Sequence, residues 1–156
     1  MTTLKIVASL TIAAAFWSAA PLHSADPNFS GAWKLNLEKS VISALAVPPD
    51  GSVVVEHEAA AIRWRPVLED GKTASPLIYS TDGKERKNQQ GSTLMKSILK
   101  WEGDALLVNT IVSGPSGNHT QMDRWRLSRD GKTLRVRRQV VRRQGEAEAT
   151  LVYEKQ

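Results

Sequence analysis

Four Asp-Gly pairs divide the chain into short segments, and this spacing of turn residues restricts the possible folds more than any other feature. The pairs are Asp50-Gly51, Asp70-Gly71, Asp82-Gly83 and Asp130-Gly131, and Glu102-Gly103-Asp104 is a further turn of the same kind. Glycine adopts the positive φ that tight hairpin loops require, and aspartate caps such loops with its side chain. The intervening runs of about 6 to 11 residues are rich in Val, Leu, Ile, Thr and Trp, which predicts a sandwich or barrel of short strands.

Alternation of apolar and polar residues supports the strand interpretation. In Arg124-Trp125-Arg126-Leu127 the apolar side chains fall on one face and the arginines on the other, and Leu134-Arg135-Val136-Arg137 repeats this pattern. Val53, Val55 and His57 share one face of another segment. A period of two is expected of strands, because successive side chains point to opposite sides of a sheet.

The chain is therefore predicted to be all-β, an antiparallel up-and-down meander that closes into a barrel of about eight or nine strands. Closure removes the two free edges that a long meander would expose. A barrel of this size is just wide enough to be filled by side chains or to hold one small ligand. Residues 40–46 are expected to form a short helical turn and residues 84–91 a loose loop. Strands are expected over residues 31–37, 52–58, 61–69, 74–81, 92–101, 105–112, 119–128, 133–143 and 147–155.

The first 25 residues have the layout of a secretory signal peptide. Lys5 lies in a short positive segment, residues 6–17 are apolar, and residues 18–25 are mostly small. The apolar run is shorter than the roughly 20 residues needed to span a bilayer, although an uncleaved anchor is the alternative. Cleavage after Ala25 would leave residues 26–156 as one domain, located in the periplasm or secreted.

Several chemistries find no support in the sequence. The chain has no Cys, so a disulfide framework, a thiol nucleophile and a lipid-bearing cysteine are all excluded. No Gly-x-Ser-x-Gly elbow and no Gly-rich phosphate loop occur. Nothing selects a pair of carboxylates for glycoside hydrolysis. We therefore expect no cofactor and assign no catalytic residue.

Four segments together resemble a known family. Asn28-Phe29-Ser30-Gly31-Ala32-Trp33-Lys34-Leu35-Asn36 places a Gly-x-Trp at the start of the first strand. Residues 101–106, 124–134 and 151–155 continue the pattern to the end of the chain. This combination resembles lipocalins and their calycin relatives, and in particular small exported bacterial proteins with a lipocalin-like barrel.

The resemblance implies a tryptophan, Trp33, at the closed end of the barrel, with a basic residue of a late strand packed across it. Arg124, Arg126 and Arg142 are the candidates, and alternation does not choose among them. The resemblance implies no catalytic residue.

Five residues are candidates for a ligand site inside the barrel. Tryptophans provide large apolar surfaces that either fill a core or line a pocket, and both outcomes remain open. His57 could contact a ligand, transfer a proton together with Tyr79, or lie at the barrel rim. Glu56 and Glu58 face away from it, so no metal site is expected. The candidate ligand-binding residues are His57, Trp64, Tyr79, Trp101 and Trp125.

A basic segment is the strongest compositional anomaly. Nine of the twenty residues from Arg124 to Arg143 are Arg or Lys, in a chain of formal net charge +5. Consecutive arginines such as Arg137-Arg138 cannot both face solvent on a regular strand, so a bulge or an inward arginine is expected. The segment could bind an anionic surface, or be a solvated outer face that prevents edge-to-edge pairing. The candidate anion-binding residues are Arg135, Arg137, Arg138 and Arg142.

Three functions remain open from the sequence. The first is binding of a small apolar or amphiphilic molecule, which predicts a cavity of at least ~300 Å³. The second is a structural or interaction module with a filled barrel and an arginine-rich face. The third is an enzyme built around His57 in the barrel mouth. Nucleic acid is not an expected partner, because no stacking aromatics share a face with these arginines. We expect a monomer.

Overall fold

The structure, a computed structural model, describes residues 26–43 and 48–156. Its strands form a single antiparallel sheet in the order β5-β4-β3-β1-β11-β10-β9-β8-β7-β6, and β2 pairs with β11. The strands are β1 (Gly31–Leu35), β2 (Val41–Ile42), β3 (Ser52–Glu58), β4 (Ala61–Pro66), β5 (Leu77–Ser80), β6 (Arg86–Gln90), β7 (Thr93–Glu102), β8 (Ala105–Ser113), β9 (His119–Leu127), β10 (Thr133–Arg142) and β11 (Gly145–Lys155).

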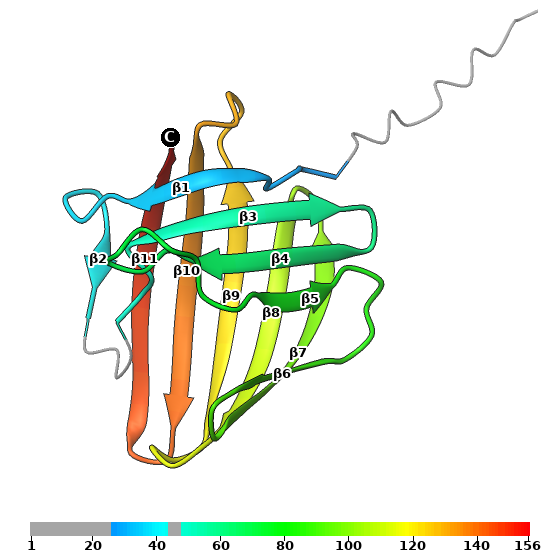
Figure 1. Cartoon of the computed structure of the whole chain (residues 1–156). Coiled ribbons are helices and arrows are strands. Elements are labelled where there is room, and N and C mark those ends of the chain that lie inside the picture. Colours follow the sequence, from blue (N-terminus) through cyan, green and yellow to red (C-terminus); the bar gives the residue numbers. More distant parts are fainter. Residues whose placement is uncertain (1–25, 44–47) are drawn as a thin grey trace, which may run out of the picture.

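The sheet curls into a nearly closed barrel. β1, β3, β4 and β5 cross over the long strands β7 to β11, and the core lies between the two layers (Figure 1). The two ends of the sheet, β5 and β6, are joined by a side chain. The Asn88 amide accepts a hydrogen bond from the Ile78 N–H at 2.8 Å and donates one to the Ile78 carbonyl at 2.9 Å. The expected antiparallel barrel is thus confirmed.

Two of the predicted glycine turns, Asp130-Gly131 and Glu102-Gly103-Asp104, form hairpins, between β9 and β10 and between β7 and β8. Asp82-Gly83 instead connects β5 to β6, the two ends of the sheet, and Gly51 does not adopt the positive φ expected of it. Between β9 and β10, Gly131 has a φ of 68°. The Asp130 carboxylate accepts hydrogen bonds from the Lys132 N–H at 3.1 Å and from the Ser128 hydroxyl at 2.6 Å. Asp82 makes the same two contacts, with the Ser80 hydroxyl and the Lys84 N–H. These hydrogen bonds, the one from Ser80 first, lower the pKa of Asp82 to about 2.

Two local predictions were wrong. Val41 and Ile42 are not helical but pair with Thr150 and Ala149 of β11, which extends the sheet where β1 has ended. Residues 44–46 of the predicted helical turn lie outside the described residues. The polar segment expected to be a loop contains β6, which pairs with β7 over its whole length. The described residues therefore contain eleven strands rather than nine.

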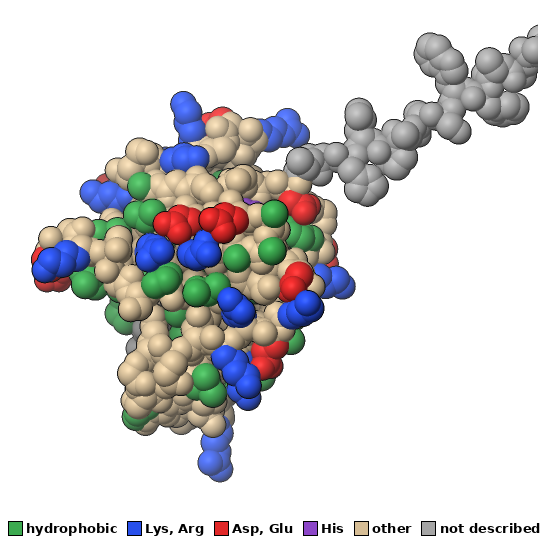
Figure 2. Space-filling view, turned by 45° about the vertical axis from the view of Figure 1, so that its right-hand side comes forward, with side chains coloured by type: hydrophobic (Ala, Val, Ile, Leu, Met, Phe, Trp, Pro, Cys, Tyr) green, Lys and Arg blue, Asp and Glu red, His purple; other side chains and the backbone are tan. Residues whose placement is uncertain are grey.

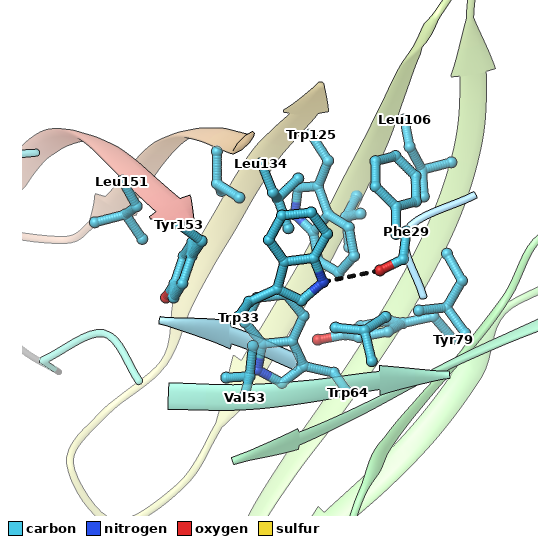
Figure 3. Close-up of a cluster of buried hydrophobic side chains, with 14 of the residues drawn as sticks. Phe29, Trp33, Val53, Trp64, Tyr79, Leu106, Trp125, Leu134, Leu151 and Tyr153 are labelled. Atoms are coloured by element: carbon cyan, nitrogen blue, oxygen red, sulfur yellow. Dashed lines mark hydrogen bonds between the residues drawn. The ribbon is translucent and has the colours of Figure 1, made fainter. Parts of the chain in front are cut away.

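The core is aromatic. Trp33 is 1% exposed, and its Nε1 donates a hydrogen bond to the Phe29 carbonyl at 2.9 Å (Figure 3). Around it lie Trp64, Trp125 and Tyr153, which come from β4, β9 and β11. Because these strands lie far apart along the chain, the indoles hold the two layers of the barrel together.

Candidate functional site

One end of the barrel is filled by Phe29. Its ring packs against both His57 and Trp101, with centroid distances of 5.7 and 5.9 Å, and meets Trp125 edge-on. His57 and Trp101 also contact each other, at a centroid distance of 6.3 Å. The Phe29 N–H donates to His57 Nδ1 at 3.2 Å, and the His57 N–H donates to the Ser30 hydroxyl at 2.9 Å. These contacts attach the segment before β1 to the end of β3.

A lysine takes the position expected of an arginine on Trp33. Lys155 Nζ lies 5.3 Å from the Trp33 ring centroid, within cation–π range. The predicted candidates are excluded by their positions. Arg124 and Arg126 form ion pairs with Glu102 and Asp104 on the outside of the barrel. Arg142 pairs in register with His119, at the opposite end of β10.

Gly31 allows this close approach. A Cβ at this position would lie 2.6 Å from Lys155 Cε, and the φ of Gly31 is 148°. The lysine stem therefore passes directly over the start of β1. Because glycine has no side chain, the backbone at Gly31 can come this close to the Lys155 side chain.

The interior contains a pocket of about 150 Å³. Trp64 and Trp125 pack at a centroid distance of 5.0 Å, and Tyr79 meets Trp125 edge-on at 5.9 Å, so the pocket has an aromatic wall. The pocket is lined by Pro48, Pro49, Asp50, Trp64, Pro66, Leu77, Tyr79, Gln90, Met95, Gln121, Trp125 and Arg138.

A buried ion pair forms the polar side of this pocket. Arg138 donates from Nε and from a terminal nitrogen to the two carboxylate oxygens of Asp123, at 2.8 and 2.7 Å. Gln121 donates to the same carboxylate at 3.1 Å. The side chain of Arg138 is 18% exposed and that of Asp123 is 3% exposed. A guanidinium has five N–H donors, so Arg138 can still donate to a molecule in the pocket.

The other polar groups around the pocket include the Asp50 carboxylate, the Gln90 and Gln121 amides and neutral donors. Trp64 Nε1 donates to the Asp50 carboxylate at 2.8 Å, which fixes the indole. Burial raises the pKa of Tyr79, with a further increase from Asp123, so its hydroxyl stays protonated. Trp125 Nε1 is buried and has no hydrogen-bond partner among the described residues. The pocket therefore presents aromatic surface and hydrogen-bond donors, together with the Asp50 carboxylate that accepts from Trp64.

The pocket is smaller than the sequence hypothesis required. Its volume of about 150 Å³ is half of the ~300 Å³ expected for a drug-sized ligand. A protein cavity of ~150 Å³ holds a molecule of the size of benzene. The space is thus sufficient for one ring but not for a larger ligand.

The structure brings together only part of the predicted ligand set. Trp64, Tyr79 and Trp125 line the interior pocket. His57 and Trp101 instead line a separate hollow of about 220 Å³ at the closed end. Because His57 Nδ1 accepts the Phe29 N–H and Tyr79 lies in the other pocket, the proton-transfer pair considered for an enzyme is not formed.

The predicted arginines also separate. Arg138 points into the barrel, as the consecutive arginines require. Arg135 and Arg137 are exposed on the outer face of β10, opposite Arg126 and Arg124 of β9. Arg142 lies at the end of β10. The four therefore do not form one anion site.

Sequence reasoning missed several residues of the pocket. Asp123 shares the inward face of β9 with Trp125, so the same alternation that placed the tryptophan also predicts an inward carboxylate. This carboxylate explains how Arg138 can be buried. Leu77 and Met95 had no comparable signal, because their segments show no clear alternation.

Known proteins provide a fold but no family for this chain. Neither a protein-family model nor a curated protein matches it. Several solved structures are similar, among them the following three. A secretory abundant heat soluble protein of Ramazzottius varieornatus has 18% identity and a TM-score of 0.59, with 82% of this chain and 95% of that chain covered. This chain has the same antiparallel β-barrel fold as these structures.

The second similar structure is a zebrafish ileal bile acid-binding protein in complex with cholic acid, at 17% identity and a TM-score of 0.57, covering 82% of this chain and 98% of that chain. The third is secretory abundant heat soluble protein 4 of Ramazzottius varieornatus, at 16% identity and a TM-score of 0.52, covering 82% and 94%. At these identities the likeness concerns the fold alone.

Proposed function

We propose that this protein binds a compact amphiphilic molecule inside the barrel. The observation that carries the proposal is the interior pocket, in which Trp64, Tyr79 and Trp125 form an apolar wall and Arg138 supplies donors. Ligand pockets combine apolar surface with a few placed polar groups, and this pocket has that composition.

The dimensions of the pocket define the ligand class. A volume of about 150 Å³ accepts one aromatic ring with a small substituent. The charge of Arg138 is already balanced by Asp123, so the pocket offers hydrogen bonds rather than net positive charge. We therefore expect a neutral acceptor, such as a carbonyl or a hydroxyl, to be preferred to a carboxylate.

The first 25 residues bear on where in or outside the cell the protein acts. We infer that residues 1–25 direct export to the periplasm or beyond, because they combine a basic start, an apolar run and a small-residue segment. A fold without cysteine functions in either redox environment, so the leader alone supports this location.

Calorimetric titration with a panel of small ring compounds tests the binding proposal. Acetophenone, benzaldehyde and benzyl alcohol serve as neutral probes, and benzoate serves as the charged one. Leu77→Trp would fill the pocket and is expected to abolish heats of binding. Arg137→Gln removes the neighbouring outward arginine and should leave binding unchanged.

Two results would contradict the proposal. Equal binding by the Leu77→Trp variant would place the ligand outside the barrel. A lack of heat from every probe, with a folded protein by near-ultraviolet circular dichroism, would favour the second candidate, an interaction module. The small interior volume supports that candidate, which uses the outer arginines instead.

A further inference from the structure

The outer face of β7 to β10 is strongly basic. Alternation along these four strands directs six cations outward, and the basic face is defined here by Lys96, Lys100, Arg124, Arg126, Arg135 and Arg137. The register places Arg135 directly opposite Arg126, and Arg137 directly opposite Arg124. Like charges directly opposite each other destabilise a sheet, so the fold retains two unfavourable pairs at its centre.

Internal carboxylates balance only half of these arginines. Glu102 pairs with Arg124, and Asp104 pairs with Arg126 at 3.1 Å. Within residues 26–43 and 48–156, no carboxylate lies within 4.0 Å of a charged nitrogen of Arg135 or Arg137. Both side chains are exposed and could contact an external anion.

The outer face of β3 and β4 provides a contrast within the same molecule. Arg63 pairs with Glu58 at 3.0 Å, and Arg65 pairs with Glu56 at 3.5 Å. Acidic and basic side chains therefore adjoin on that side of the barrel (Figure 2). General solubility would be served equally by such balanced pairs, so the excess of cations on β7 to β10 calls for a different explanation.

Apolar side chains lie among the cations. Ile98 is 46% exposed and Ile111 is 55% exposed. Ile98 is opposite Asn109, two residues from Ile111, so the two isoleucines are diagonal neighbours on one face. A hollow of about 400 Å³ on the same face is lined by Leu107 and Met122 together with Arg124 and Arg137, and Glu148 of β11 adds one carboxylate to it.

This combination identifies the kind of partner. An acidic polysaccharide or a free phosphate would use the cations but not the isoleucines. The surface of an anionic bilayer offers phosphates for the arginines and an acyl boundary for exposed apolar side chains. We propose that the basic face docks onto an anionic lipid bilayer, with Arg135 and Arg137 on headgroup phosphates and Ile98 and Ile111 at the acyl boundary.

Vesicle flotation tests this proposal. The probes are vesicles of phosphatidylcholine alone and vesicles with about 30% phosphatidylglycerol, because cation binding follows the anionic fraction. Arg135→Gln/Arg137→Gln is expected to bind the anionic vesicles roughly 30-fold more weakly, since each cation at such a surface contributes about a factor of five. Arg63→Gln/Arg65→Gln removes the same charge from the balanced face and should retain binding.

The two double variants have the same leader, residues 1–25. Any binding of its apolar run to the vesicles is therefore the same in both and does not affect the comparison. Equal weakening by the two double variants would overturn the proposal, because net charge alone would then govern binding. Binding of the two vesicle types to the same extent would overturn it as well.

A third variant tests the choice of partner. Ile98→Thr/Ile111→Thr keeps β-branched side chains and all charges, and should weaken binding to the anionic vesicles several-fold. Unchanged vesicle binding by this variant, together with retention on a heparin column that depends on Arg135 and Arg137, would contradict the bilayer and favour an acidic polymer.

Discussion

At the scale of single residues, the Asp123–Arg138 pair determines the character of the interior. Two charges lie inside a largely apolar barrel, and each compensates the other through two hydrogen bonds. Removing one partner of a buried pair leaves an unbalanced charge, whereas removing both can be neutral. The pair therefore provides polar groups in the interior and contributes little net free energy to the stability of the fold.

Single and double substitutions separate these two roles. Asp123→Leu or Arg138→Met alone should lower the free energy of unfolding by about 3 to 5 kcal/mol. The double variant should recover most of this loss, because no charge is then left without a partner. Urea unfolding of the four proteins measures the coupling. Additive losses in the double variant would show that the two side chains act independently.

His57 makes the closed end sensitive to pH. Burial lowers the pKa of His57 from its usual 6.5, with a smaller opposing effect of Asp26, so the folded protein favours the neutral ring. The unfolded chain then binds more protons below about pH 6.5. Stability is fully present above this pH and should decrease as the pH falls through the lowered pKa of the folded state.

Urea unfolding between about pH 7.5 and pH 5 tests this prediction. The variant His57→Gln should lose the part of the pH dependence that His57 contributes. Burial also lowers the pKa of His119, so His119→Gln is the matched variant. A pH dependence that persists unchanged in His57→Gln would refute the role given to His57.

At the scale of elements, the start of β1 depends on the absence of a side chain. Gly31→Ala would place a Cβ against the Lys155 stem, at a φ that favours glycine. We expect a loss of about 1 to 3 kcal/mol in unfolding free energy. Thermal melting measures the loss, and Ala32→Ser at the adjacent exposed position is the control. A wild-type melting temperature for Gly31→Ala would contradict this prediction.

The contact between β5 and β6 depends on one amide. Asn88→Ala would leave the Ile78 N–H and carbonyl without their partners, at a cost of about 1 to 3 kcal/mol. Hydrogen exchange of the Ile78 amide should accelerate in this variant. The exposed neighbour Gln89→Ala should change neither quantity. Unaltered exchange at Ile78 would show that another group closes the barrel.

Turn chemistry and alternation predicted most of these elements because both are local. Asp130-Gly131 and Glu102-Gly103-Asp104 located two hairpins, and alternation placed Trp64 and Trp125 inward and Arg135 outward. β6 escaped prediction because only Asn88 of its residues is buried. His57 and Trp101 were assigned to the ligand site because Phe29, which separates them from it, precedes the first strand and has no alternation to place it.

At the scale of the whole molecule, the barrel is closed at one end and partly filled. Phe29, Trp33 and Lys155 occupy the closed end, so any ligand space is displaced toward Arg138. The fold is shared with a bile acid-binding protein, but the pocket here suits a single ring. The proposed function therefore follows from the side chains that fill this barrel rather than from its topology.

Nuclear magnetic resonance of the indole N–H groups tests the central claim most directly, because each tryptophan reports on its own region. On titration with acetophenone, the signals of Trp64 and Trp125 should shift, while those of Trp33 and Trp101 should stay in place. Shifts confined to Trp101, or no shift at any indole with the whole panel of ring compounds, would contradict an interior binding site.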